Sequence, residues 1–79
     1  MKMNELATGE AAIVTHIKLS GDIRRRLFDL GLIKGTKVEC VMKSHKGNPI
    51  AFRFRGALIA LRNVDTDRIE VRKEVERWD

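Results

Sequence analysis

The chain has 79 residues, a length that fits one domain. It carries 16 Lys and Arg against 11 Asp and Glu, for a formal net charge of +5 with both histidines neutral. No stretch approaches the ~18 apolar residues of a membrane span. The first residues lack the apolar core of a signal peptide, and a lone cysteine excludes an internal disulfide. We therefore expect one small domain in a reducing cytoplasm.

Positive charge is concentrated in the middle of the sequence. Residues 18–62 hold 11 basic and 3 acidic side chains, a balance of +8, whereas the two flanking stretches are slightly acidic. A basic centre favours an anionic partner such as nucleic acid, a phospholipid surface or an acidic protein face. The alternative is an ordinary solvated surface of mixed charge.

The first two predicted elements are a strand at residues 10–17, rich in small and β-branched side chains, and a helix that follows it. Ser20 is the predicted N-cap, and Asp22 lies in the first turn, where the helix dipole favours an anion. Gly31 supplies the left-handed residue that ends the helix. One apolar stripe repeats at i, i+4 and i+7 and is predicted to be buried: Ile23, Leu27 and Leu30.

Three consecutive arginines lie on this helix: Arg24, Arg25 and Arg26. Successive helical residues point about 100° apart, so these side chains fan over a wide arc and do not form a single phosphate clamp. Arg25 also precedes Asp29 by four residues and can pair with it.

Four further strands are predicted from apolar alternation between turn residues, at residues 36–43, 50–55, 57–62 and 68–72. In the first of them, Val38, Cys40 and Met42 share the predicted inward face. Residues 57–62 are apolar on both faces, which predicts a strand covered from two sides. A turn is expected at residues 63–67. Five short strands at this spacing predict a mostly β protein, a small barrel or sandwich.

The segments RLFDLGLIKGTKVECV, KGNP, FRGALIALR and DRIEV, in this order, resemble the FeoA family of ferrous-iron transport accessory proteins. The resemblance extends from about Leu6 to Val71. Its most specific parts are an R-L-x-D-L-G-L-x-x-G-x-x-V frame and a G-x-x-I-A-L-R frame. The residues that match these frames include Arg26, Leu27, Asp29, Leu30, Gly31, Gly35, Gly56 and Leu61, and we assign them a structural role.

The resemblance implies a single domain over residues 1–79, an SH3-like β-barrel of about five strands with one short helix inserted after the first strand. Residues 73–79 would form a charged tail. A similar domain is found in the metal-dependent repressors of the DtxR type. For Trp78 in the tail the sequence leaves two placements open, against the barrel or between protomers of a homo-oligomer, and we expect the first.

The resemblance also implies a cytoplasmic, non-enzymatic adapter that acts with the membrane transporter FeoB. The sequence agrees, because it has no phosphate-binding G-x-x-x-x-G-K-[ST] loop. We predict a partner-binding surface on the helix and the turn after it, where basic side chains lie beside exposed apolar surface. Its residues are Arg24, Arg25, Phe28, Leu32 and Lys34.

Candidate metal ligands are scattered and show no paired spacing: His16, Cys40 and His45. Cys40 lies on a predicted core face, and His45 neighbours Lys46, which disfavours a cation. We therefore expect no metal site and no cofactor, and at most weak or adventitious binding of a divalent metal.

Nucleic-acid binding is the main alternative function, since small barrels bind single strands with a basic groove and stacking aromatics. Arg53, Phe54 and Arg55 alternate in that manner. However, Phe52 and Phe54 share a face with Ile50, which favours a place in the core. We therefore expect no nucleic-acid partner. A metal-responsive regulatory domain is a further alternative.

Overall fold

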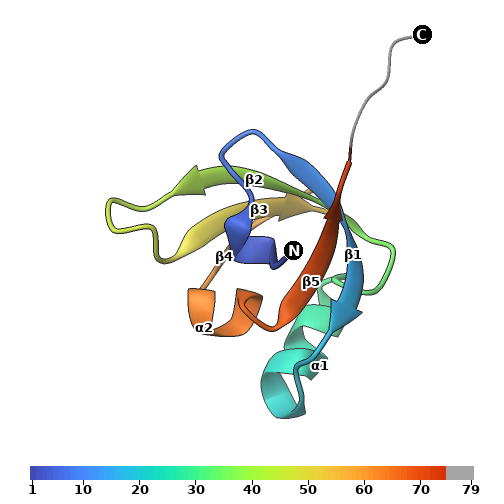
Figure 1. Ribbon diagram of the computed structural model, residues 1–79. Helices are drawn as coiled ribbons and strands as arrows, with labels where there is room; N and C mark the ends of the chain where they lie inside the picture. Colours follow the sequence, from blue (N-terminus) through green and yellow to red (C-terminus); the bar gives the residue numbers. More distant parts are fainter. Residues whose placement is uncertain (75–79) are drawn as a thin grey trace, which may run out of the picture.

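The computed structural model describes residues 1–74 (Figure 1). Five strands form one antiparallel sheet in the order β4-β3-β2-β1-β5. In chain order the elements are η1 (Met3–Glu5), β1 (Ala11–Ile17), α1 (Gly21–Asp29), β2 (Lys37–Lys43), β3 (Ile50–Phe54), β4 (Ala57–Leu61), α2 (Asn63–Thr66) and β5 (Ile69–Lys73).

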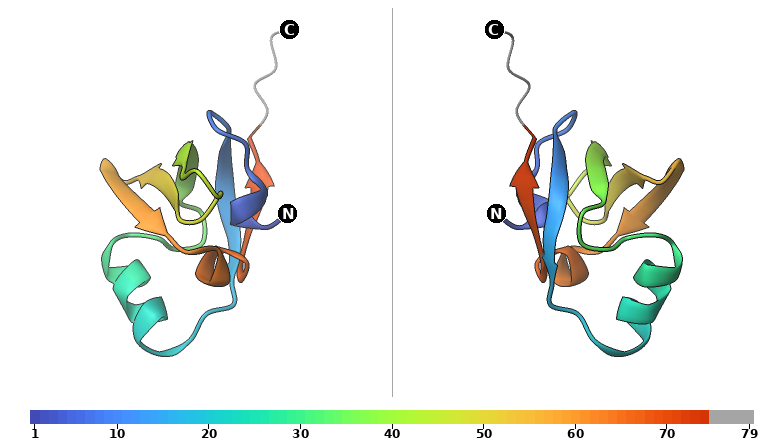
Figure 2. Two further views of the ribbon diagram at one scale, coloured as in Figure 1. Left: turned by 90° about the vertical axis from the view of Figure 1, so that its left-hand side faces the viewer. Right: turned by 90° about the vertical axis from the view of Figure 1, so that its right-hand side faces the viewer.

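The sheet curls round a single core, and α1, which follows β1 in the chain, projects at one end of the molecule (Figure 2). The predicted mostly β, SH3-like architecture with one helix after the first strand is confirmed. None of the helices in residues 1–74 is long and apolar enough to span a membrane. Trp78 lies outside the described residues.

Alternation along the strands builds the core. In β3, Ile50, Phe52 and Phe54 are at most 2% exposed. Facing strands supply smaller side chains: Ala12, Val14, Val38, Cys40, Ile69 and Val71. Two more core residues, Met3 and Leu6, come from the N-terminal segment, for which the sequence predicted no element.

Two of the predicted strand faces are wrong. Met42 is 61% exposed, because the pairing of β2 with β3 shifts between Cys40 and Met42 and turns the side chain outward. Leu58 is 54% exposed, and the burial of β4 alternates, so Leu58 and Ala60 lie on a face of the strand that is open to water. The strand at residues 57–62 is therefore covered on one face only.

Two boundaries also differ from the predictions. The expected turn at residues 63–67 contains the short helix α2, which holds the fully buried Thr66. The predicted tail begins too early, because Lys73 belongs to β5 and the Glu74 N–H donates to the Ala11 carbonyl at 3.0 Å.

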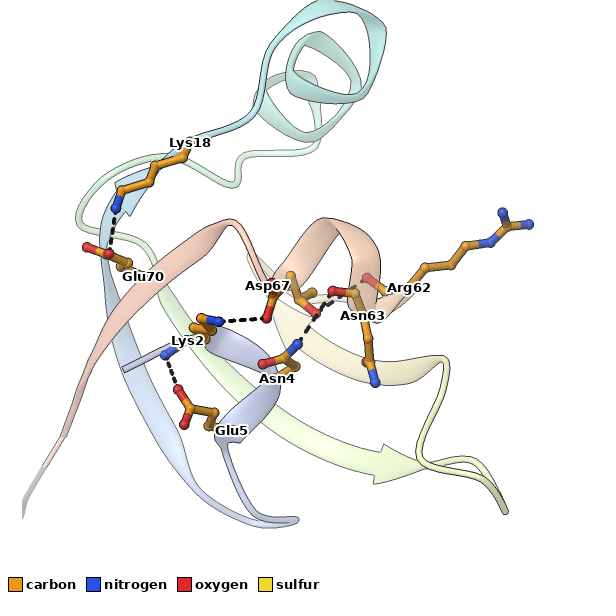
Figure 3. Close-up of polar contacts among 9 residues, drawn as sticks. Lys2, Asn4, Glu5, Lys18, Arg62, Asn63, Asp67 and Glu70 are labelled. Atoms are coloured by element: carbon orange, nitrogen blue, oxygen red, sulfur yellow. Dashed lines mark hydrogen bonds and ion pairs between the residues drawn. The ribbon is translucent and has the colours of Figure 1, made fainter.

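The N-terminal segment is fastened to the outer edge of the sheet (Figure 3). The Val71 N–H donates to the Met1 carbonyl at 2.8 Å. Lys2 Nζ lies 3.1 Å from Asp67 Oδ1, and its backbone N–H donates to Glu5 Oε1 at 2.6 Å. These contacts place Met3 over the open end of the core.

Helix α1 starts and packs differently in detail from the prediction. Ser20 occupies the N-cap position with extended backbone, but its side chain makes no capping hydrogen bond. Of the predicted buried stripe, only Leu27 is fully buried; Ile23 and Leu30 are partly buried against the core. The helix therefore rests on the barrel by one edge and leaves most of its surface in water.

The chain turns from α1 into β2 at a corner formed by residues 30–36. The Gly31 N–H donates to the Phe28 carbonyl and the Leu32 N–H to the Leu27 carbonyl, both at 2.9 Å. This pair of bonds is a Schellman motif, which requires a left-handed residue, and Gly31 has a φ of +94°. Leu27 and Leu32 are each 1% exposed, so the corner is anchored in the core.

Further hydrogen bonds fix the corner to the barrel. The buried Thr36 hydroxyl donates to the Gly31 carbonyl at 2.9 Å and accepts from the Ile33 N–H at 3.1 Å. The Gly35 N–H donates to the Val14 carbonyl, and the Val14 N–H donates to the Thr36 carbonyl. The corner is thus hydrogen-bonded both internally and to β1.

The β3–β4 hairpin packs against the same corner. Its two-residue turn, Arg55–Gly56, has φ values of +53° and +76°, as in a type I′ turn. A Cβ atom on Gly31 would lie 2.8 Å from Arg55 Cγ. The missing side chain of Gly31 therefore makes room for the Arg55 stem.

We expect Gly31→Ala to lower the free energy of unfolding by more than about 1 kcal/mol, because it adds left-handed strain and a clash with Arg55. Gly35→Ala is the matched control, since Gly35 also has a positive φ (+93°) but faces open space. Urea denaturation should show a larger loss for Gly31→Ala. The excess should shrink in an Arg55→Ala background; an unchanged excess would contradict the packing argument.

Acid should weaken the fold through three carboxylates at the surface, of which Glu10 and Glu70 are partly buried and Asp67 is exposed. Hydrogen bonds from Lys73, Lys2 and Lys18 lower the pKa values of Glu10, Asp67 and Glu70, respectively. A carboxylate whose pKa is lower in the folded than in the unfolded chain stabilises the fold. The unfolded pKa is 4.5 for Glu and 3.8 for Asp. The stabilisation is complete at a pH above this value and is lost as the pH falls through the pKa of the folded state.

We therefore expect the urea midpoint to fall between about pH 6 and about pH 3. It should fall less steeply in a Lys2→Met, Lys18→Met, Lys73→Met variant, because its carboxylates have lost their partners. Parallel pH profiles for the two proteins would show that these pairs make no contribution.

Candidate protein-docking surface

A groove of about 310 Å³ separates α1 and the corner from the second half of β1. We call it the α1–β1 groove. Four of the five residues predicted to bind a partner line it: Arg24, Phe28, Leu32 and Lys34. The opposite wall is formed by Thr15, His16 and Ile17 of β1, and Ile33 completes the lining. The structure thus gathers most of the predicted surface round one concavity.

Phe28 is the exposed apolar side chain of this surface. It follows the buried Leu27 on α1 and is 61% exposed, because the helix contacts the barrel by one edge only. The prediction was exposed apolar surface from Phe28 or Leu32, and of the two only Phe28 is exposed. The Schellman motif carries Leu32 into the core, where only 1% of it is accessible at the groove floor.

The three arginines of α1 point to different sides, as predicted. Arg24 faces the α1–β1 groove. Arg25 lines an adjoining hollow of about 360 Å³ with Gly21, Arg24 and Phe28. Arg26 borders a third hollow, between α1 and β4. Within residues 1–74 no arginine of α1 forms an ion pair, including the one expected between Arg25 and Asp29.

The lining of the α1–β1 groove is basic. It contains Arg24, Lys34 and His16 and no Asp or Glu. An acidic residue, Glu70, contacts this wall from β5: its Oε2 lies 3.3 Å from His16 Nδ1, and its Oε1 accepts from Lys18 Nζ at 2.8 Å. That bond lowers the pKa of Glu70, so the carboxylate stays ionised and is already neutralised by its own neighbours.

The candidate metal ligands do not converge. Cys40 is buried in the core, which raises the pKa of its thiol. His16 pairs with Glu70 across the β1–β5 ladder, and His45 is exposed in the β2–β3 turn. In the described part of the chain no three His, Cys, Asp or Glu side chains are grouped so as to hold a metal ion.

The candidate surface for stacking nucleic-acid bases is absent from β3. Phe52 and Phe54 are 0% and 2% exposed and belong to the core, as the alternation predicted. The intervening Arg53 donates to Glu39 at 3.2 Å, and the Arg55 stem packs beside Gly31. No aromatic face is therefore available for bases on this strand.

Comparison with known proteins identifies the family. The family model for the FeoA domain matches residues 1–73. The chain belongs to the FeoA family. The FeoA family is linked to ferrous iron transport, and the resemblance inferred from the two sequence frames is confirmed.

Three relatives place the chain more closely. A Porphyromonas gingivalis Fe(2+) transport protein A/Fe(2+) transporter FeoB fusion is 28% identical over 90% of the chain, which spans 8% of the fusion. Stenotrophomonas maltophilia FeoA, an SH3 domain protein solved with zinc, is 32% identical with a TM-score of 0.79, over 91% of the chain and 89% of that protein. T. acidophilum IdeR shares the fold at 19% identity and a TM-score of 0.83, over 94% and 34% of the two chains.

The FeoA sequence frames mark mostly structural positions. Leu27 and Leu61 are buried, and Leu30 is partly buried; Gly31, Gly35 and Gly56 all have positive φ values. Arg26 and Asp29 are exposed, and nothing within residues 1–74 explains a structural role for either.

We expect Phe28 and Leu32 to respond oppositely to substitution. Phe28→Ser should leave the free energy of unfolding within about 0.5 kcal/mol, because the ring is exposed and the two residues have similar helix propensities. Leu32→Ala should lower it by about 2–5 kcal/mol, because it leaves a cavity beneath the groove. Chemical denaturation measures both. Comparable losses would mean that Phe28 is part of the core and not a docking residue.

Proposed function

We propose that this chain is a non-enzymatic accessory protein of ferrous iron transport that binds the transporter FeoB on its cytoplasmic side. The observation that carries the proposal is the P. gingivalis relative, in which a segment similar to this chain and FeoB are parts of one polypeptide. Fusion keeps two partners at high effective concentration, which suits an association between separate chains in other organisms. An activating role in ferrous iron transport has been suggested for the S. maltophilia relative.

The surface of the molecule supports a protein partner. Phe28 is a large, exposed ring flanked by Arg24 and Arg25, and interface cores are enriched in aromatic residues and arginine. The ring is carried by a helix whose end is fixed by the corner, so little conformational entropy is lost on docking. The positive charge would orient the encounter with an acidic face of FeoB.

No resident metal or cofactor enters the proposal. The three candidate ligands are apart, and one of them is buried among apolar side chains. The exposed His16 and His45 suit only weak binding of a divalent metal. Iron is then the cargo of the transporter and not a ligand of this chain.

Reversing the charge beside Phe28 should weaken docking without unfolding the chain. We expect Arg24→Glu/Arg25→Glu to weaken binding to purified FeoB by at least about tenfold, because the substituted side chains would carry the same charge as the acidic face that they meet. The fold should be retained, since exposed charges contribute about 0–1 kcal/mol each. Titration calorimetry measures the affinity, and an NMR fingerprint measures the fold.

Lys43→Glu/Lys46→Glu is the matched control. It makes the same change in net charge at exposed positions near the β2–β3 turn, far from α1 (Figure 1). This control should bind FeoB nearly as the unchanged chain does. Equal weakening of FeoB binding in both variants would mean that net charge, and not the surface round Phe28, determines the affinity. Loss of RNA binding with FeoB binding intact would favour the nucleic-acid alternative.

A further inference from the structure

The strand edge that forms one wall of the α1–β1 groove lacks a strand partner. β1 pairs with β2 only from Ala11 to Ile13, and the next contact on that side is the double hydrogen bond of Val14 with the corner. From His16 to Ile17, β1 pairs with β5 alone. Among residues 1–74 no hydrogen bond joins the groove-side backbone of Thr15, His16 or Ile17 to the rest of the chain.

The separation has a simple cause. The chain that leaves the corner first reaches β1 at Val14, where Gly35 and Thr36 bond to it, and β2 begins directly afterwards at Lys37. β2 then runs alongside the first half of β1, and the second half has no strand beside it on this side. The helix occupies the far side of the groove but does not pair with β1. A free strand edge is a template for another extended chain.

The side chains round this edge select the kind of chain. Phe28 and Ile33 offer apolar contact on the helix and corner side, while Arg24 and Lys34 supply positive charge. The lining holds no carboxylate that would repel an acidic peptide or satisfy these cations in its place. At about 310 Å³ the groove holds a short segment, comparable with the three β1 residues that line it.

We propose that the α1–β1 groove binds an extended, acidic peptide segment of the transporter, which adds as a strand to Thr15–Ile17. Backbone hydrogen bonds to β1 would provide affinity, alternate apolar side chains would contact Phe28 and Ile33, and acidic side chains would meet Arg24 and Lys34. This inference rests on the proposed function and specifies the form of the partner. A helical partner is disfavoured, because its backbone groups are already paired and would leave the β1 edge unsatisfied.

Strand addition can be tested with a capped hexapeptide of alternating valine and glutamate, titrated into the isotope-labelled protein. NMR shifts and slowed amide exchange should centre on Thr15–Ile17. Two further peptides carry N-methyl groups on either the valines or the glutamates. Alternate amides of a strand point to opposite sides, so one methylated peptide should bind at least about tenfold more weakly and the other nearly as well as the parent. Equal affinities for all three peptides would overturn strand addition.

Charge selectivity is tested by a valine–lysine hexapeptide and by Arg24→Glu/Lys34→Glu, with Lys43→Glu/Lys46→Glu as the control. The lysine peptide and the groove variant should each reduce binding at least about tenfold, and the control should not. The parent peptide should also displace FeoB. If FeoB stays bound at saturating peptide, the inference fails while the proposed function stands; if FeoB never binds the unchanged chain, the proposed function fails. NMR shifts at Thr15–Ile17 that grow with protein concentration in the absence of peptide would show that a second copy of this chain occupies the groove, and would overturn the inference.

Discussion

The close approach of the β3–β4 hairpin to the helix corner is the constraint on which the rest of this fold depends. Gly31 ends α1 with a φ of +94° and leaves the space of its missing side chain to the stem of Arg55. A residue confined to negative φ would redirect the chain before it reached Thr36. The corner is also bonded to Val14, so any displacement would extend to β1. The position of the helix relative to the hairpin and to the first strand therefore depends on this one glycine.

The same constraint determines which side chains face water. The Schellman motif draws Leu27 and Leu32 into the core, and Phe28, the neighbour of Leu27, is left exposed. The turn that follows restricts the pairing of β2 to the first half of β1. The second half of β1 therefore keeps a free edge, which lines the α1–β1 groove. The proposed docking surface would thus be ordered before it meets a partner, which favours binding. The stability of the fold and the proposed function therefore depend on the same few hydrogen bonds.

Local patterns predicted much of this fold. Gly31 as a helix end and Phe52 and Phe54 as core residues follow from glycine conformation and strand alternation. Features that depend on tertiary structure were missed: the outward turn of Met42 results from a shifted register with β3, and Leu58 is exposed because nothing covers the outer face of β4. The basic and aromatic side chains of the surface were predicted, but the free β1 edge was not, because it exists only once the corner has formed.

Cross-saturation NMR on the complex with FeoB tests the central claim most directly. The chain would be deuterated and labelled, and FeoB protonated, so that only residues in contact with the transporter lose signal. The account predicts that the losses fall on α1 and the groove, above all on Phe28 and on the neighbouring Arg24 and Ile17. Losses centred on the exposed face of β3 and β4, round Arg53 and Leu58, with α1 unaffected, would contradict it.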